Sequence, residues 1–192
     1  PLRRQRQMCI RDSKIIISVE KSENFILLFW GCVMAGCIPV LMPSVQFSNK
    51  NSIAFERLKN AIDILGVVTL ITNDINLFEY YKSSFHKAVC VEDIMKQLDL
   101  LQDYSLHIPK RDSKDLCVIQ FSSGSTGAPK GVMLSFNNIL TNLKIKTLAD
   151  EITTEDTLIH WMPYFHDYGL FGNHLVCLYC LLYTSDAADE ED

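Results

Sequence analysis

Glycines and small hydroxyl side chains alternate in the run Ser122-Ser-Gly-Ser-Thr-Gly127, and a lysine follows at position 130. Glycine lets the backbone turn its N–H groups toward an anion, and the serine and threonine hydroxyls add short hydrogen-bond donors. Lys130 adds a full positive charge, which strengthens hydrogen bonding to phosphate oxygens. The run is therefore predicted to be a loop that holds phosphate.

The segments around this run distinguish it from the Walker A motif. Residues 116–120 are apolar and predict a buried strand, and residues 131–134 predict a second short strand. In a Walker A loop the lysine is followed by Ser or Thr and then by a helix, whereas Gly131 and a strand follow Lys130. Taken alone, a serine- and glycine-rich run is more often a linker or a surface turn.

A second group of chemically capable residues occurs in the segment Trp161-Met-Pro-Tyr-Phe-His-Asp-Tyr-Gly-Leu170. It combines aromatic rings with an adjacent histidine and aspartate. Taken alone, His166 would more often be a hydrogen-bonded histidine within an aromatic core turn. The segment therefore gains its functional meaning only beside the first motif.

Together the two motifs resemble those of the adenylate-forming superfamily, which includes acyl-CoA synthetases, luciferases, peptide-synthetase adenylation domains and fatty acyl-AMP ligases. Residues 122–131 match the superfamily's phosphate loop. Residues 161–170 are similar to the Trp-x-Pro-x-x-His-Asp-x-Gly-Leu segment of the fatty acyl-AMP ligase branch, with Tyr168 where methionine is usual. The order and separation of the motifs favour this interpretation over two isolated turns.

The resemblance implies an ATP-dependent acid ligase. In such enzymes a carboxylate attacks the α-phosphorus of ATP, which gives an acyl-adenylate and pyrophosphate. Catalysis depends on positioning and charge neutralisation, because two anions must meet. The resemblance implies ATP and Mg²⁺ as cofactors, a small carboxylic acid (a fatty acid by the closest branch) as substrate, and CoA or an acyl carrier protein as candidate acceptors.

The resemblance also implies roles for individual residues. Lys130 would be a catalytic charge partner of the β- and γ-phosphates, and Thr126 would be their main hydroxyl donor. His166 would be the second catalytic residue and would lie near the acyl carboxylate, but it is not needed as a general base because a carboxylate is already ionised near neutral pH. The implied cofactor-binding residues are Ser122, Ser123, Gly124, Ser125, Thr126, Gly127 and Lys130. The implied substrate-binding residues are Trp161, Tyr164, His166 and Asp167, with Phe165 shaping the same wall.

Two other classes of function stay open at this point. A peptide-synthetase adenylation domain would activate an amino acid and would need an acidic pocket residue for the substrate's ammonium group. A non-catalytic nucleotide-binding fragment would use the first motif only as a scaffold turn. Neither the superfamily's ribose-binding aspartate nor its small C-terminal domain can be recognised in the sequence, so we expect an N-terminal fragment that is inactive alone.

The two ends of the chain are expected to be foreign to the fold. One strand of an oligonucleotide that resembles a sequencing-library adapter encodes residues 3–12, and its complementary strand encodes residues 180–189. We therefore expect residues 1–13 and 180–192 to be translated adapter sequence, which leaves residues 14–179 as a partial AMP-binding domain. A basic targeting or nucleic-acid arm and an acidic solvated tail are the alternatives.

Apolar strand patterns alternate with helical patterns along the chain, with Ser22, Ser52 and Ser135 placed to cap helices. This alternation is typical of an α/β sheet with mostly parallel strands flanked by helices. It also resembles the opening of the large N-terminal domain of adenylate-forming enzymes. The predicted strands are 15–19, 38–42, 67–72, 88–91, 116–120 and 131–134, and the predicted helices are 23–36, 52–66, 77–85, 93–101 and 135–148.

Composition limits the partners and the compartment. A net charge of −5 is ordinary for a globular protein and predicts no nucleic-acid partner. Cys32 and Cys117 lie among apolar residues, which predicts buried, reduced thiols and a cytoplasmic location. The apolar run 25–36 is shorter than the roughly 20 residues of a membrane span and is interrupted by glycine, so it predicts a core helix.

Overall fold

The computed structural model of the chain describes residues 12–66, 68–82, 87–99, 108–122 and 130–180. The chain divides into two compact units, residues 1–136 and residues 137–192. We describe each unit by itself. The prediction of one partial domain over residues 14–179 stays a prediction.

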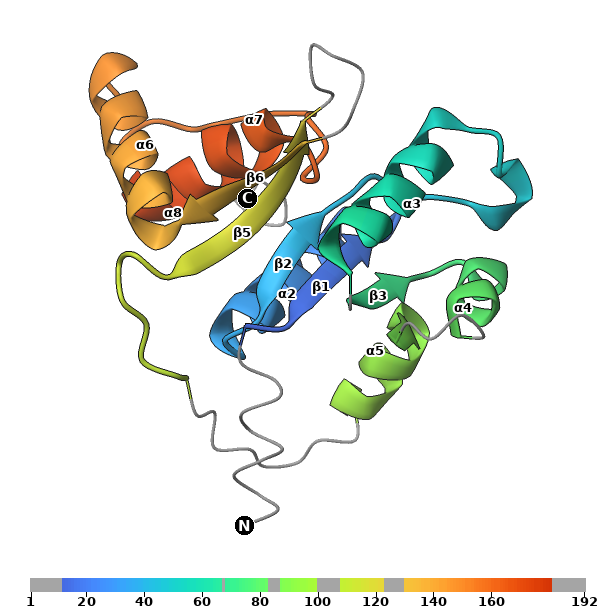
Figure 1. Ribbon diagram of the computed structural model, residues 1–192. Coiled ribbons are helices and arrows are strands. Elements are labelled where there is room, and N and C mark those ends of the chain that lie inside the picture. Colours follow the sequence, from blue (N-terminus) through green and yellow to red (C-terminus); the bar gives the residue numbers. More distant parts are fainter. Residues whose placement is uncertain (1–11, 67, 83–86, 100–107, 123–129, 181–192) are drawn as a thin grey trace. The chain divides into compact units, whose positions relative to one another are not determined.

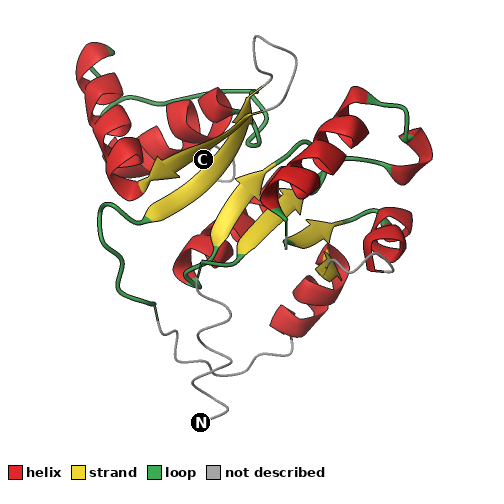
Figure 2. Cartoon of the chain, viewed as in Figure 1, coloured by secondary structure: helices red, strands yellow, loops and turns green. Residues whose placement is uncertain are grey.

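The first unit is built on one six-stranded sheet with the order β4-β3-β1-β2-β5-β6 (Figures 1 and 2). The neighbouring strands are parallel except for the β5–β6 pair, which is antiparallel. The predicted class, a mostly parallel sheet flanked by helices, is confirmed. The strands are β1 Lys14–Ser18, β2 Ile38–Leu41, β3 Thr69–Thr72, β4 Lys87–Cys90, β5 Leu116–Ser122 and β6 Lys130–Ser135.

Helices cover both faces of this sheet. In Figure 1, α3 lies in front of β1 and β2, whereas α2 lies behind them. The order of the strands explains this, because β2 and β3 flank β1 on opposite sides and crossovers of one hand then place their helices on opposite faces. The helices of this unit are α2 Ser22–Met34, the 3₁₀ turn η1 Phe47–Asn49, α3 Ile53–Leu65, α4 Ile75–Lys82 and α5 Val91–Asp99.

A row of fully buried aliphatic side chains crosses the sheet. Ile16 pairs in register with both Val40 and Leu70, and Val40 pairs with Ile119, so these four side chains share one face. Each is at most 1% exposed, and α3 contributes Leu58 to the same core. The core therefore ties β5, which leads into the predicted phosphate loop, to the centre of the sheet.

The ends of two helices test the predicted caps. Ser52 caps α3 as predicted, because its Oγ accepts a hydrogen bond from the backbone N–H of Phe55 at 3.2 Å. The prediction for Ser22 is wrong. Lys21 is the N-cap residue of α2, it makes no side-chain cap, and Ser22 is already the first helical residue.

Helix α4 begins two residues earlier than predicted because an aspartate precedes it. Asp74 accepts a hydrogen bond from the backbone N–H of Leu77 at 2.8 Å, which satisfies a donor at the start of the helix. Its second carboxylate oxygen accepts from the backbone N–H of Phe47 at 3.0 Å. The predicted end of this helix, near residue 85, lies outside the described residues.

The second unit consists of helices joined by a segment of turns and irregular structure. Helix α6 spans Phe136–Ala149, and three consecutive elements follow later: α7 Asp167–Gly169, the π-helical turn η2 Leu170–His174 and α8 Leu175–Cys180. On α6, Ile139 and Leu143 are buried, as their spacing of four residues predicts. Ile145 is 60% exposed, because a step of two residues along the helix turns it away from the face of Leu143.

The apolar run at 25–36 forms a core helix, as predicted: Phe25 and Phe29 of α2 are buried. Across the described ranges, no helix has both the length and the apolar character that a membrane crossing demands. Cys32 and Cys117 are free and buried, and desolvation raises the pKa of each thiol to about 12. The prediction of buried thiols at these positions is confirmed.

Candidate functional site

The predicted phosphate loop connects the two strands of a hairpin. Strand β5 ends at Ser122, strand β6 begins at Lys130, and these two residues are directly paired. The expectation that the loop lies between two strands, with no helix after the lysine, is confirmed. Five of the predicted contact residues lie outside the described residues: Ser123, Gly124, Ser125, Thr126 and Gly127.

The loop leaves the sheet at the edge where α/β proteins bind ligands. Strand β5 is parallel to β2, and β2 is parallel to β1, so Ser122 lies at the carboxyl ends of these strands. Ligands of open α/β sheets bind at that edge. The position of the hairpin is therefore the one expected for a ligand-binding loop.

Ser122 and Lys130 present a hydroxyl and a cation at the two ends of the loop. Directly paired residues of antiparallel strands have Cα atoms about 4.5–5.5 Å apart and side chains on the same face. Both residues are exposed. Within the described part of the chain, no carboxylate lies within ion-pair distance of the Lys130 ammonium. Its charge is thus available to an anion.

Gly131, the last glycine of the first motif, has a packing role. A Cβ atom at this position would lie 3.3 Å from Cζ of Phe121 and 3.3 Å from Cγ2 of Ile119. Both contacts are tighter than ordinary van der Waals distances. The absence of a side chain at Gly131 therefore lets the Phe121 ring lie close to β6, next to Lys130.

The second motif folds into a tight turn that leads into helix α7. The backbone N–H of His166 donates to the carbonyl of Pro163 at 3.0 Å, and the N–H of Leu170 donates to the carbonyl of His166 at 3.1 Å. Gly169 lies directly against Pro163, since a Cβ there would be 2.2 Å from the Pro163 carbonyl oxygen. Only glycine fits at this point of the turn.

His166 and Asp167 contact each other at the start of α7. Nδ1 of His166 lies 2.7 Å from Oδ1 of Asp167. The backbone N–H of Tyr168 lies 2.7 Å from the same carboxylate oxygen and 3.2 Å from Nδ1. The Tyr168 N–H donates to Nδ1, which therefore acts as an acceptor and caps the start of α7. Nε2 then stays available to a ligand.

Tyr168 is the residue at which the motif differs from the fatty acyl-AMP ligase segment that it resembles. Its backbone and its ring contact Asn173, Lys146 and Gly172. Asn173 donates from Nδ2 to the Tyr168 carbonyl at 2.8 Å, and the Lys146 ammonium lies 5.4 Å from the centre of the Tyr168 ring. A Cβ on Gly172 would approach the ring to 2.9 Å. Asn173 is 5% exposed and was not predicted. The sequence signal that could have identified Asn173 is its position as a polar residue within an apolar helical run.

The Tyr164 ring of the motif contacts two histidine rings, those of His160 and His174. The His160 and Tyr164 ring centres are 5.4 Å apart at 83°, and the Tyr164 and His174 ring centres are 5.5 Å apart at 77°. Both contacts are edge-to-face. Neither histidine was among the predicted site residues. Trp161, predicted to line the acyl pocket, is 88% exposed in this structure, and its role stays a prediction.

The chain is expected to become less stable as the pH falls, because the pKa of buried His174 is lowered. Burial, and secondly the charge of His160, lower the pKa of His174 from its ordinary value of 6.5. As the pH drops below that value, the unfolded chain takes up the proton first, so the folded state loses free energy relative to it. The loss is at most about 1.4 kcal/mol per pH unit for one proton.

Urea unfolding of the wild-type chain and of His174→Phe at pH 7.5 and pH 5.5 would test this. The other titrating groups are common to both proteins, so the wild type should lose more stability between the two pH values. An equal loss in both would contradict the assignment.

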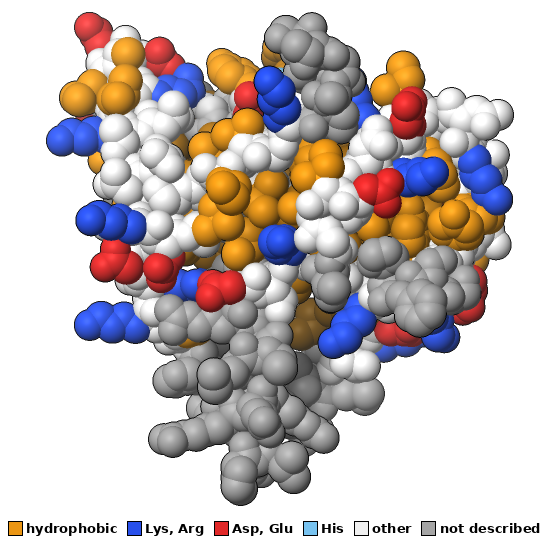
Figure 3. All heavy atoms as spheres, in the orientation of Figure 1, with side chains coloured by type: hydrophobic (Ala, Val, Ile, Leu, Met, Phe, Trp, Pro, Cys, Tyr) orange, Lys and Arg blue, Asp and Glu red, His pale blue; other side chains and the backbone are white. Residues whose placement is uncertain are grey.

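Lys130 and Ser122 belong to the first unit, and the residues around His166 belong to the second. The two units are described separately, so the assembly of these residues into one site stays a prediction. No group of three or more His, Cys, Asp or Glu side chains suited to a metal ion occurs in the ranges that the structure describes. On the face shown in Figure 3, positively and negatively charged side chains are interspersed with apolar patches.

Comparisons with known proteins agree on one family. The AMP-binding enzyme family matches residues 8–185 of this chain. A 4-hydroxyphenylalkanoate adenylyltransferase of Mycobacterium tuberculosis is 27% identical over 166 residues, which cover 82% of this chain and 26% of that protein. The JamA medium-chain-fatty-acid–[acyl-carrier-protein] ligase of Moorena producens is 25% identical over 88% of this chain and 29% of its own length.

The fold is shared with a solved structure of an adenylate-binding protein. McyG A-PCP complexed with phenylalanyl-adenylate superimposes with a TM-score of 0.78 and 24% identity, over 90% of this chain and 27% of that one. The α/β fold implied by the resemblance is thereby confirmed. This chain spans less than a third of the length of each of these three proteins.

Proposed function

Since this chain belongs to the AMP-binding enzyme family, we propose that the full-length protein activates a carboxylic acid as an acyl-adenylate and releases pyrophosphate. The observation that carries this proposal is the direct pairing of Ser122 with Lys130 at the carboxyl edge of the sheet. This pairing closes a loop whose composition is suited to phosphate. The ammonium of Lys130, the first residue of β6, has no carboxylate partner among the described residues.

Lys130 and the hydroxyls of the loop would stabilise the charge that moves onto the pyrophosphate leaving group. Preorganised donors and cations act strongly on such developing charge. Ser122 and Lys130 fit the triphosphate of ATP by their chemistry, and Mg²⁺ would supply further charge neutralisation on the phosphate oxygens. The described residues contain no cluster for the ion, and we assign it no protein ligand.

We assign His166 to the carboxyl group of the acid. Its Nδ1 accepts a hydrogen bond from the backbone N–H of Tyr168 at 3.2 Å, so Nε2 is the ring nitrogen left to face a substrate. A carboxylate needs no base, because it is already ionised near neutral pH. His166 therefore orients the nucleophile, and the backbone N–H of Tyr168 fixes the ring of His166. Tyr164 and Trp161 would form the adjoining wall for the acyl group.

We propose a fatty acid as the substrate and a carrier protein as the acceptor, with CoA as the other candidate. The segment 161–170 resembles the fatty acyl-AMP ligase branch, and the relative from Moorena producens joins a fatty acid to an acyl carrier protein. An amino acid is the second candidate, because McyG A-PCP binds phenylalanyl-adenylate. We propose a cytoplasmic location from the free buried thiols of Cys32 and Cys117.

ATP–pyrophosphate exchange by the full-length protein tests the function. The panel should contain fatty acids of increasing length, hydroxyphenylalkanoic acids and amino acids, each with ATP and Mg²⁺. We expect exchange with fatty acids above that with amino acids. Preference for an amino acid would replace the proposed substrate, and no exchange with any acid would favour a non-catalytic nucleotide-binding protein.

A further inference from the structure

The ring of Tyr164 contacts two histidine rings that come from different elements. His160 lies in the segment before the motif and Tyr164 lies in the turn that precedes α7, whereas His174 is the last residue of the π-helical turn η2. The interplanar angle is 83° between His160 and Tyr164 and 77° between Tyr164 and His174. Such edge-to-face contacts restrict the orientation of the central ring.

The π-helical turn η2 places the ring of His174 against Tyr164. A π turn accommodates an extra residue relative to an α-helix, which rotates the following side chains by about 100°. His174 closes η2, so a regular α-helix would carry its ring away from Tyr164. Wide turns of this kind occur frequently at functional sites.

His160 depends on the same contact. Its Nδ1 is buried and has no hydrogen-bond partner in the described part of the chain. The edge-to-face contact with Tyr164 is one restraint on this side chain, and Trp161 follows it directly in sequence. Tyr164, His160 and the backbone of the motif are thus expected to move as one.

From these contacts we propose that His160 and His174 are positioning residues that fix the Tyr164 ring and so set the fit of the acyl group. This inference rests on the proposed function, in which Tyr164 lines the acyl pocket. The histidines act through Tyr164 and contact neither ATP nor the reacting carboxylate. Their replacement should therefore change affinity for the acid and leave affinity for ATP nearly unchanged.

A double-mutant cycle in the full-length protein tests this inference, with KM for the acid and for ATP measured by pyrophosphate exchange. His174→Ala should raise KM for the acid about tenfold, since it removes one aromatic contact and frees the ring. KM for ATP should stay within about twofold of the wild-type value. His174→Phe keeps an aromatic edge and should recover most of the loss.

The cycle is completed in a Tyr164→Ala background. There His174→Ala should have no further effect on KM for the acid, because the ring on which it acts is gone. Additive effects would overturn the proposal, as would equal rises in both KM values or a His174→Phe variant as impaired as His174→Ala. If His174→Ala fails to fold, His160→Ala takes its place in the same cycle.

A second measurement separates this inference from the proposed function. In the 192-residue chain, NMR resonances of the Tyr164 ring should show the ring-current shifts of its two neighbours, and His174→Ala should remove one of these shifts. Exchange activity without the predicted coupling between His174 and Tyr164 would contradict only the positioning role. Ring-current shifts in a protein that exchanges no acid would sink the proposed function and, with it, the role in acyl fit.

Discussion

Replacing Lys130 with alanine in the full-length protein is expected to slow acyl-adenylate formation by about a hundredfold or more, as does the loss of other preorganised charge-stabilising groups. Lys130 pairs with Ser122 at the mouth of the phosphate loop and has no carboxylate partner among the described residues. In the proposed role this charge acts on the phosphates of ATP. Pyrophosphate exchange at saturating ATP and acid measures the effect.

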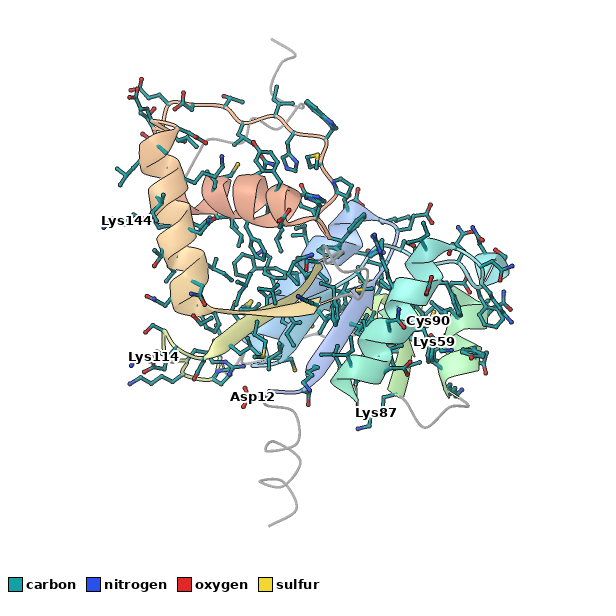
Figure 4. The ribbon with its side chains drawn as sticks, turned by 45° about the horizontal axis from the view of Figure 1, so that its top comes forward. Asp12, Lys59, Lys87, Cys90, Lys114 and Lys144 are labelled. Atoms are coloured by element: carbon teal, nitrogen blue, oxygen red, sulfur yellow. The ribbon has the colours of Figure 1, made fainter. Side chains whose placement is uncertain are left out.

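Lys114→Ala is the matched control, because it removes the same charge from the same unit. Lys114 is exposed and precedes β5, and Figure 4 shows it at the periphery of the molecule. The length of β5 from Leu116 to Ser122, about 20 Å at 3.3 Å per residue, separates it from the loop. Unchanged exchange in Lys130→Ala, or an equal loss in both variants, would contradict the assigned role.

Most of the sheet could be predicted because its signals are local. Strands β1, β2 and β3 are short apolar runs that alternate with helical patterns, and their predicted positions agree with the structure to within two residues. Ser52 caps α3 because a serine in extended backbone can reach the N–H three residues ahead. The prediction that Ser22 caps α2 is wrong because Lys21 is the extended residue that precedes the helix. The presence of a serine in the sequence does not reveal which residue takes that conformation.

The contacts within the second motif could not be predicted, because they depend on tertiary geometry. The π-helical turn brings His174 onto Tyr164, and no periodicity in the sequence marks such a turn. The same holds for Asn173, whose amide reaches back to the carbonyl of Tyr168. Gly169 was recognisable as a fixed position of the motif, but only the structure gives the reason for it.

Gly169→Ala is expected to destabilise the second unit by at least about 3 kcal/mol, at the upper end of the cost of overpacking. An added Cβ would lie 2.2 Å from the carbonyl oxygen and 2.8 Å from the carbonyl carbon of Pro163. Both atoms belong to the backbone and cannot rotate away. The turn from Pro163 to Leu170 would have to open, which would displace His166.

Two other glycines provide a graded comparison, measured by urea unfolding of the 192-residue chain. Gly31 in α2 has no atom within 4 Å of an added Cβ, so Gly31→Ala should be neutral or stabilise by up to about 1 kcal/mol through helix propensity. Gly172→Ala should lie between the two, because its 2.9 Å contact is with the Tyr168 ring, a side chain that can shift. A Gly169→Ala variant as stable as Gly31→Ala would show that the turn at Pro163 can accommodate a Cβ atom. The description of the His166 segment as a tight turn would then be wrong.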